Sequence, residues 1–167
     1  PQELFAWIAR IAPANGRVWE AGCGSGQASR DLAAVFDDVF ATDPSASQIA
    51  QAGQIDRVRL AVESGERCSL ADASVDAVTA SMVLFFLPDV AAGLAELRRV
   101  LRPGGALAFS VFGPSDPRWQ PVYEAFLPYL PTGRREDLSR PRHPALLSAP
   151  AITATLRPYQ RDGYHFL

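Results

Sequence analysis

Three glycines and two carboxylates are spaced so that together they could hold a ligand. The sequence EAGCGSG at 20–26 begins with an acidic residue, Glu20, and places glycines at alternate positions, Gly22, Gly24 and Gly26. Alternate glycines let a backbone turn sharply and approach a ligand closely. Asp43 follows twenty-one residues after Gly22, where an acidic side chain can accept hydrogen bonds from both hydroxyls of a ribose. The pattern predicts a nucleoside-type ligand.

The charge of Glu20 selects among such ligands. A pyrophosphate at a helix N-terminus is stabilised by backbone amides and the helix dipole, and a neighbouring carboxylate would repel it. A ligand that carries positive charge is favoured instead. The glycine spacing, G-x-G-x-G, also differs from the G-x-G-x-x-G of dinucleotide-binding loops. Two alternatives remain: Glu20 pairs with Arg17 or Arg30, and Asp43 caps the helix expected to begin at Ser45.

Composition excludes several classes of chemistry. All 16 basic residues of the 167-residue chain are arginine, so a phosphate-loop lysine and a Schiff-base lysine are both ruled out. The net charge of −2 leaves no basic field for a phosphate backbone, and we expect no nucleic acid partner. Two cysteines and two histidines are too few and too scattered for a structural zinc site, and we expect no metal.

The length and hydropathy pattern indicate one domain over residues 1–167. Because the sequence begins at Pro1 rather than at methionine, truncation at both ends is left open. No run of about 20 apolar residues and no basic-plus-apolar leader are present, so we expect a cytoplasmic protein without membrane association. The oligomeric state is not indicated.

Helical and extended patterns alternate through the first two-thirds of the chain. We expect helices over 2–12, 26–36, 45–52 and 90–101, and strands over 17–21, 38–43, 57–62, 75–81 and 106–112. Such alternation predicts a doubly wound α/β fold, a mostly parallel sheet with helices on both faces. The pattern weakens after residue 113, where we expect a helix over 119–130 interrupted at Pro128 and two strands over 151–156 and 164–167.

Four segments in this order resemble the class I S-adenosylmethionine-dependent methyltransferases. They read VWEAGCGSGQ (18–27), ATDPS (41–45), LADASVDAVTAS (70–81) and RRVLRPGGALAFS (98–110). The opening QELFAWIARIAP further resembles the small-molecule branch that includes trans-aconitate-methyltransferase-like proteins. The resemblance implies a Rossmann-like methyltransferase fold with S-adenosylmethionine as cofactor.

The resemblance also implies roles for individual residues. Glu20 would lie near the amino-acid end of the cofactor, the three glycines would line its path, and Asp43 would take the ribose hydroxyls. Other positions would contact the adenine, namely Pro44, Ser45, Ser64, Gly65 and Glu66, or lie by the transferring methyl group, namely Ser81 and Met82. Two departures stand out: many relatives have aspartate where this chain has Ser64, and His-Trp-Phe where it has the run LFFLP at 84–88.

Methyl transfer from a sulfonium fits this inventory. The protein must supply proximity, alignment and a site with little water, and no metal or covalent nucleophile is required. A general base is needed only if the acceptor carries a proton at neutral pH. His143 is a weak candidate for that base, alongside His165, although a surface histidine is the commoner interpretation.

We therefore expect methyl transfer to a small organic acceptor, with oxygen slightly preferred as the acceptor atom. The chain lacks the Asn/Asp-Pro-Pro-Tyr/Phe motif of relatives that methylate DNA bases or glutamine. One alternative is a non-catalytic S-adenosylmethionine-binding regulatory module. A less favoured alternative is a nicotinamide-dependent oxidoreductase.

Overall fold

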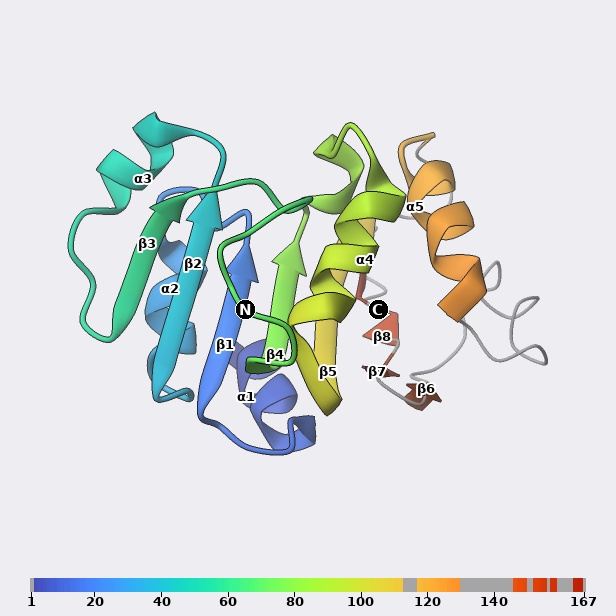
Figure 1. Ribbon diagram of the computed structural model, residues 1–167, viewed down its shortest axis with the longest axis horizontal. Coiled ribbons are helices and arrows are strands. Elements are labelled where there is room, and N and C mark those ends of the chain that lie inside the picture. Colours follow the sequence, from blue (N-terminus) through green and yellow to red (C-terminus); the bar gives the residue numbers. More distant parts are fainter. Residues whose placement is uncertain are drawn as a thin grey trace.

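The computed structural model describes residues 2–112 and 117–129, and four short strands between residues 146 and 166. Five strands run parallel in the order β3-β2-β1-β4-β5 (Figure 1). Their bounds are β1 Arg17–Ala21, β2 Asp38–Asp43, β3 Val58–Val62, β4 Val75–Ser81 and β5 Leu101–Phe112. Their carboxyl ends share one edge of the sheet, which is the edge where ligands bind in open parallel sheets.

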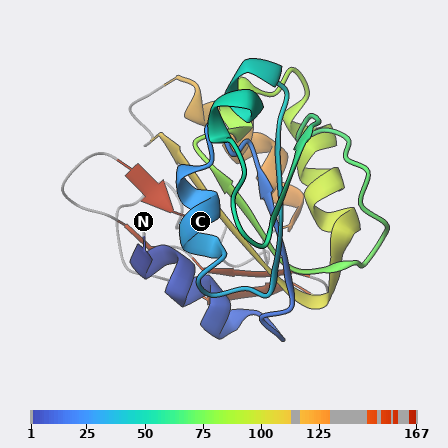
Figure 2. The same cartoon turned by 90° about the vertical axis from the view of Figure 1, so that its left-hand side faces the viewer.

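Helices cover both faces of this sheet, as the alternation predicts (Figure 2). Helices α1 (Gln2–Ile11), α2 (Gln27–Leu32) and α3 (Ala46–Ala52) pack on one face. Helices α4 (Val90–Val100) and α5 (Trp119–Phe126) pack on the other, with the short 3-10 helices η1 (Leu84–Phe86) and η2 (Leu127–Tyr129) beside them. The predicted doubly wound α/β architecture is confirmed.

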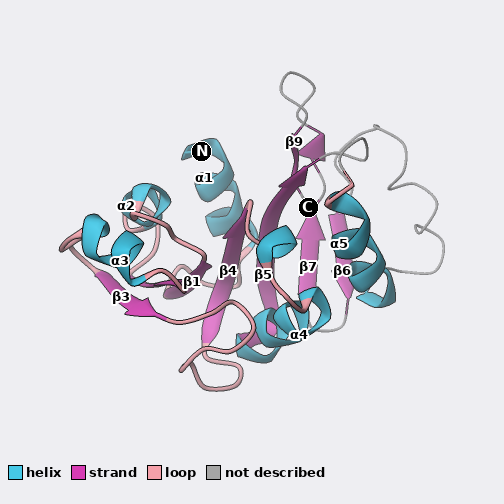
Figure 3. Cartoon of the chain, turned by 90° about the horizontal axis from the view of Figure 1, so that it is seen from above, coloured by secondary structure: helices cyan, strands magenta, loops and turns pink. Residues whose placement is uncertain are grey.

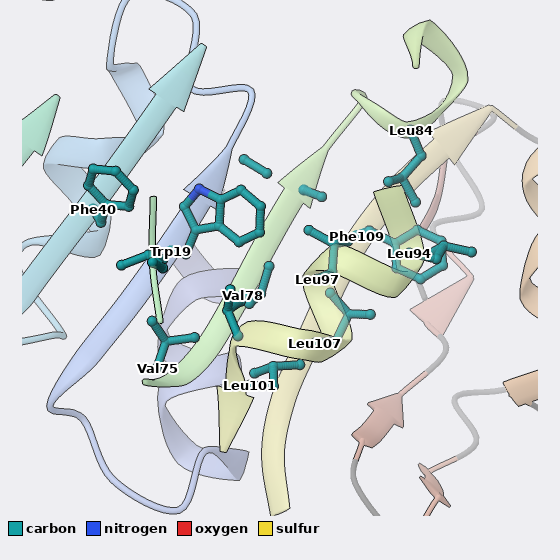
Figure 4. Close-up of a cluster of buried hydrophobic side chains, with 14 of the residues drawn as sticks. Trp19, Phe40, Val75, Val78, Leu84, Leu94, Leu97, Leu101, Leu107 and Phe109 are labelled. Atoms are coloured by element: carbon teal, nitrogen blue, oxygen red, sulfur yellow. The ribbon is translucent and has the colours of Figure 1, made fainter. Parts of the chain in front are cut away.

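The two faces of the sheet carry different side chains, because successive residues of a strand point to opposite sides. Large apolar residues face α4 and α5 (Figure 4), among them Trp19, Phe40, Val78, Leu107 and Phe109. Smaller residues face α1 and α2, among them Val18, Val39, Ala77, Ala106 and Ala108. The small side chains let α1 and α2 approach the sheet closely, and these two layers form the core.

Between residues 2 and 112, two element boundaries differ from the prediction by more than one residue; beyond them, the helix expected over 119–130 is α5, which ends at Phe126, followed by η2 over Leu127–Tyr129. Helix α2 ends at Leu32, four residues before the predicted end, because the backbone tightens into i→i+3 hydrogen bonds such as Val35 N to Leu32 O. Strand β5 begins at Leu101 instead of 106. Leu101 pairs with Val75, and the next pair joins Ala106 to Ala77, so residues 102–105 bulge between them.

The C-terminal strands extend the sheet beyond β5. Strand β7 (Ile152–Thr155) pairs with β5 in parallel and with β6 (Leu146–Ala149) in antiparallel orientation. Strand β9 (Tyr164–Phe166) pairs antiparallel with both β5 and β8 (Arg157–Pro158). The two strands expected in this region match β7 and β9. The sequence around β6 and β8 is rich in proline and arginine, and its pattern predicts neither strand. Within the described residues, no helix is long and apolar enough to cross a membrane.

A buried carboxylate fastens three strands at the amino edge of the sheet. Asp76, 2% exposed, accepts a hydrogen bond from the backbone N–H of Arg17 at 2.8 Å and pairs with the guanidinium of Arg102. A Cβ added to Gly16 would lie 2.8 Å from the Asp76 carboxylate, so the turn before β1 passes directly over it. Asp76 thereby joins β1, β4 and the start of β5 at the end opposite the glycine loop.

We expect Asp76→Ala to destabilise the fold by about 3 kcal/mol, because it leaves a buried N–H and a guanidinium without their anionic partner. Chemical unfolding measures the change. Asp72→Ala is the matched control: Asp72 also pairs with an arginine, Arg99, but its side chain is 80% exposed, so its loss should cost less than about 1 kcal/mol. Equal losses for the two variants would contradict the assignment.

Candidate functional site

The loop between β1 and α2 is attached to the end of β2. The backbone N–H groups of Gly22 and Cys23 both donate to the carbonyl oxygen of Thr42, at 2.7 and 2.9 Å, and Gly26 N–H donates to Cys23 O at 3.0 Å. Seen from above the sheet (Figure 3), this connection joins β1 to α2 next to α3. The glycine loop therefore lies at the carboxyl edge, where the sequence places it.

The three glycines are needed for different reasons, although all have left-handed φ angles of 73°, 55° and 78° in chain order. A Cβ on Gly22 would lie 2.2 Å from the Val83 side chain, and one on Gly26 would lie 2.7 Å from that of Ile55. Packing thus excludes larger residues at both. A Cβ on Gly24 would meet nothing closer than 3.9 Å. Gly24 alone of the three presents its backbone to open space, as a ligand cradle requires.

Glu20 is a buried carboxylate at the carboxyl end of β1. It is 5% exposed, and its Oε2 accepts a hydrogen bond of 2.5 Å from the hydroxyl of Ser29 on α2. Burial raises the pKa of Glu20 from an ordinary 4.5 to about 7, and the Ser29 hydrogen bond opposes part of this rise. A positive charge beside Glu20 would favour its ionised form, so the site is suited to a cationic ligand.

The predicted alternative for Glu20, a salt bridge to Arg17 or Arg30, is wrong. The Arg17 guanidinium pairs with Asp38 at 2.5 Å. The Arg30 guanidinium donates to the carbonyl oxygens of Gly26 and Ala52, at 2.9 and 3.1 Å. Arg30 therefore braces the start of α2 against the end of α3, and neither of the two predicted arginines pairs with Glu20.

Asp43 connects the glycine loop to the start of α3. Its Oδ2 accepts from Gly24 N–H and its Oδ1 from Ser45 N–H, both at 2.9 Å. Each carboxylate oxygen can accept a second hydrogen bond, so the partly exposed Asp43 keeps capacity for two ligand hydroxyls. Ser45, whose hydroxyl accepts from Gln48 N–H at 3.4 Å, is the N-cap of α3. The alternative that Asp43 caps this helix is wrong.

Cys23 lies between the two carboxylates without being a nucleophile. Burial, and then the negative charges of Glu20 and Asp43, raise the pKa of its thiol to about 12. The thiol therefore stays protonated at neutral pH. Within the part of the chain that the structure describes, no cluster of histidine, cysteine and acidic residues could hold a metal ion.

The end of β4 lies beside the glycine loop. The hydroxyls of Ser81 and Ser110 are 2.8 Å apart, and the N–H of Met82 donates to the carbonyl oxygen of Ser110 at 2.9 Å. Met82 has a left-handed φ of 57°, which turns the chain so that Val83 packs on Gly22. The structure thus brings Ser81 and Met82 next to the glycine loop, which follows Glu20 in the chain.

The adenine-side residues predicted after β3 form a separate turn. Ser64 bridges to Arg67, and its hydroxyl accepts from Glu66 N–H at 3.2 Å. The Glu66 carboxylate accepts from Asp89 N–H at 2.7 Å, which ties this turn to the start of α4. Gly65 is buried against Leu87, and Pro44 is exposed beside Asp43. Glu66 therefore has a structural partner, and its role toward adenine stays a prediction.

Sequence reasoning missed Ser29 and Ser110, which position the predicted site residues. Ser29 follows Gly26 by three residues, so its place in the first turn of the helix after the glycine loop was the available signal. Ser110 carries no such signal, because it lies inside the largely apolar strand β5. His143, the weak base candidate, lies outside the described residues, as does the side chain of His165.

Comparison with known proteins identifies the family. A family model described as a methyltransferase domain matches residues 19–109, which include the glycine loop, Asp43, the end of β4 and most of β5. The chain belongs to this methyltransferase family. Proteins with this domain and fold use S-adenosylmethionine as cofactor, as predicted.

Three relatives show how far the similarity extends. A demethylmenaquinone methyltransferase of Beutenbergia cavernae is 40% identical over 118 residues, covering 70% of this chain and 48% of its own. A malonyl-[acyl-carrier protein] O-methyltransferase of Methylococcus capsulatus is 33% identical, covering 67% and 43%. A solved structure of a proposed type II methyltransferase from Anaeromyxobacter dehalogenans is 34% identical, with a TM-score of 0.64 and coverage of 90% and 68%. The chain spans about half the length of the curated relatives.

We expect Glu20→Gln to stabilise the fold increasingly as pH rises. Because the pKa of Glu20 is about 7 in the folded protein and 4.5 as its ordinary value, the contribution of Glu20 to stability is greatest below pH 4.5 and is lost as the pH rises to about 7. The neutral amide avoids this loss, which amounts to at most about 3 kcal/mol. Chemical unfolding at pH 5 and pH 8 tests the difference.

Asp56→Asn is the control for this comparison, because the Asp56 side chain is 98% exposed. Its stability relative to wild type should not change between the two pH values. A stability gain for Glu20→Gln that is the same at pH 5 and pH 8 would show that burial of the charge is not its cause.

Proposed function

We propose that this chain catalyses S-adenosylmethionine-dependent methyl transfer to a small organic acceptor, with oxygen as the first candidate for the acceptor atom. One observation carries the proposal: two carboxylates, Glu20 and Asp43, flank the open backbone of Gly24 at adjacent strand ends. The cofactor supplies an electrophilic methyl group on a positively charged sulfur. The chain then has to bind, align and desolvate the reactants.

The charges at the carboxyl edge fit this cofactor. Glu20 is acidic and buried, and no arginine of the described residues pairs with it, so it suits the ammonium of the cofactor's amino-acid end and disfavours a phosphate. Asp43 has free acceptor capacity for ribose hydroxyls. In this proposal Gly22 and Gly26 shape the loop. The remaining predicted contacts are Pro44, Ser45, Ser64, Gly65 and Glu66 toward adenine, and Ser81 and Met82 toward the methyl group.

The acceptor side is apolar near the end of β4. Phe86 in η1 is 73% exposed, and its ring centroid lies 4.5 Å from that of Phe85. This surface favours an acceptor with an apolar part. Relatives differ in the acceptor that their names state, a demethylmenaquinone in one and a malonyl-acyl carrier protein oxygen in another. A carboxylate oxygen would need no general base, whereas a hydroxyl would, with His143 as the candidate.

The remaining expectations from the sequence belong to the same proposal. The described strands join one sheet, which supports a single domain over residues 1–167. The net charge of −2 supports a small-molecule acceptor over nucleic acid, and a cytoplasmic location follows from the sequence pattern. The narrower resemblance to the trans-aconitate branch stays a prediction.

Calorimetric titration with S-adenosylmethionine, S-adenosylhomocysteine and NAD tests the cofactor assignment. We expect both sulfur nucleosides to bind and NAD not to bind. Glu20→Gln and Asp43→Ala should each weaken S-adenosylhomocysteine binding about tenfold or more, the loss typical of a hydrogen bond to a charged group. Asp56→Asn, an exposed carboxylate change, should leave the affinity unchanged.

The same titration separates the alternatives. Binding of NAD alone would favour the nicotinamide-dependent oxidoreductase and overturn the cofactor argument. Binding of the sulfur nucleosides without transfer of a labelled methyl group to oxygen, sulfur or carbon acceptors would favour the non-catalytic binding module.

Gly24→Ala tests whether the open backbone is the cradle. Gly104 is the matched control, because it also has a left-handed φ, 78°, and open space around its Cβ position, but lies at the amino end of β5. Both alanine variants should lose about 1 kcal/mol of stability through backbone strain. Only Gly24→Ala should weaken S-adenosylhomocysteine binding, about tenfold or more. Equal affinities for the two variants would remove Gly24 from the site.

A further inference from the structure

The hydroxyl of Thr79 is buried and lacks a hydrogen-bond partner among the described residues. The residue is 3% exposed, and its Oγ1 is the one buried side-chain polar atom in that part of the chain for which no partner is found. Buried polar atoms are almost always hydrogen-bonded, so an exception requires an explanation. One such explanation is that the hydroxyl forms its hydrogen bond only in another state of the site.

Thr79 lies directly beside Glu20. The parallel ladder between β1 and β4 pairs Glu20 with Thr79, so their side chains project from the same face of the sheet on strands about 4.8 Å apart. This is the face covered by α1 and α2, where Ser29 on α2 donates to Glu20 Oε2. Among the described residues, Ser29 is the side chain that donates a hydrogen bond to Glu20, and it donates to Oε2. The other carboxylate oxygen, Oε1, is available for a second hydrogen bond. The χ1 angle of threonine has more than one staggered position, and a hydroxyl can donate to a carboxylate oxygen.

We propose that Thr79 is a positioning residue: its hydroxyl donates the second hydrogen bond to the ionised carboxylate of Glu20 and holds that carboxylate as the anionic anchor for the cofactor. The anchoring role rests on the proposed function. The hydrogen bond between Thr79 and Glu20 requires only that Glu20 be charged.

The other groups around Glu20 do not supply this stabilisation. The ionisable ones are Cys23 in the loop, Asp43 at the end of β2, Arg30 on α2 and Asp76 on β4. Cys23 stays protonated and Asp43 is itself acidic. Arg30 is committed to two carbonyl oxygens, and Asp76 is paired at the other end of β4. The described residues that face this layer from α1 and β5 are uncharged, namely Phe5, Ile8, Ala108 and Ser110.

The size of the effect follows from the charge. A hydrogen bond to an ionised group shifts an equilibrium by about tenfold or more. The value near 7 reflects burial and the Ser29 hydrogen bond alone, so a Thr79 hydrogen bond should hold the pKa of Glu20 about one unit lower, and loss of the hydroxyl should return it to about 7. At neutral pH this change converts a carboxylate that is mostly ionised into one that is about half protonated.

The first test is a titration of Glu20 in the protein without cofactor, followed by the carboxyl carbon signals of 13C-labelled glutamate. Glu20→Gln identifies the signal by removing it. We expect Thr79→Val, which has the same shape without the hydroxyl, to move the midpoint up by about one pH unit. Thr79→Ser keeps the hydroxyl and should restore the wild-type midpoint. Equal midpoints for wild type and Thr79→Val would overturn the proposal.

The second test is the affinity for S-adenosylhomocysteine between pH 6 and pH 9. Thr79→Val should weaken binding about fivefold at pH 6, about twofold at pH 7 and hardly at all at pH 9, where Glu20 is ionised in both proteins. In the Glu20→Gln background, Thr79→Val should have no further effect. A loss of affinity that is independent of pH, or equal in both backgrounds, would assign Thr79 a merely structural role.

The two tests also separate this proposal from the proposed function. If wild type binds no sulfur nucleoside while the Glu20 midpoint still moves in Thr79→Val, the cofactor assignment fails and the hydrogen bond stands without its anchoring role. If the nucleosides bind and the midpoint does not move, the cofactor assignment stands and the Thr79 proposal fails.

Discussion

The parallel pairing of β1 with both β2 and β4 is the constraint on which the site depends. It sets Glu20 beside Thr79 on one side and brings Ala21 level with Thr42 on the other. In a strand, a slip of one residue would turn every side chain to the opposite face. Glu20 would then point into the large apolar layer around Trp19 and Phe40, and Ser29 could not reach it. Asp76 secures this register from the opposite edge, where it ties β1 to β4 and β5.

One face of the sheet holds most of the large apolar core, and the other carries the buried polar groups of the site. The face toward α4 and α5 carries the large side chains, and Phe126 of α5 packs edge-on against Phe109 at 5.2 Å. Burial of such rings dominates core energetics. The face toward α1 and α2 is lined by alanines at Ala77 and Ala108, and this leaves room for polar groups. A buried carboxylate costs free energy, which the aromatic layer on the opposite face offsets.

Much of the fold could be predicted from local patterns. The bounds of β1, β2 and β4 are the predicted ones, because each strand is a short apolar run closed by a turn or an acidic residue. The end of α2 could not be predicted, because the helical spacing of apolar residues continues to Phe36 although the backbone tightens after Leu32. The start of β5 could not be predicted either, because it depends on a contact with another strand. The start of β5 is defined by pairing of Leu101 with Val75 across a bulge, and nothing in the sequence around Pro103 signals that pairing.

The site divides along the same line between local and non-local information. Glycines with left-handed backbones and an acidic residue at a strand end are visible in a sequence, because the turn itself requires them. The Ser29 hydroxyl that donates to Glu20 comes from a helix face, and the Thr79 hydroxyl, which we propose as the second donor, comes from a neighbouring strand. In a sequence, serine or threonine at those positions resembles any other. The exposed apolar surface at Phe86, proposed as the acceptor side, lies in the loop after β4. Strand register constrains Glu20 but places no such constraint on this loop, so the sequence predicts the cofactor edge better than the acceptor side.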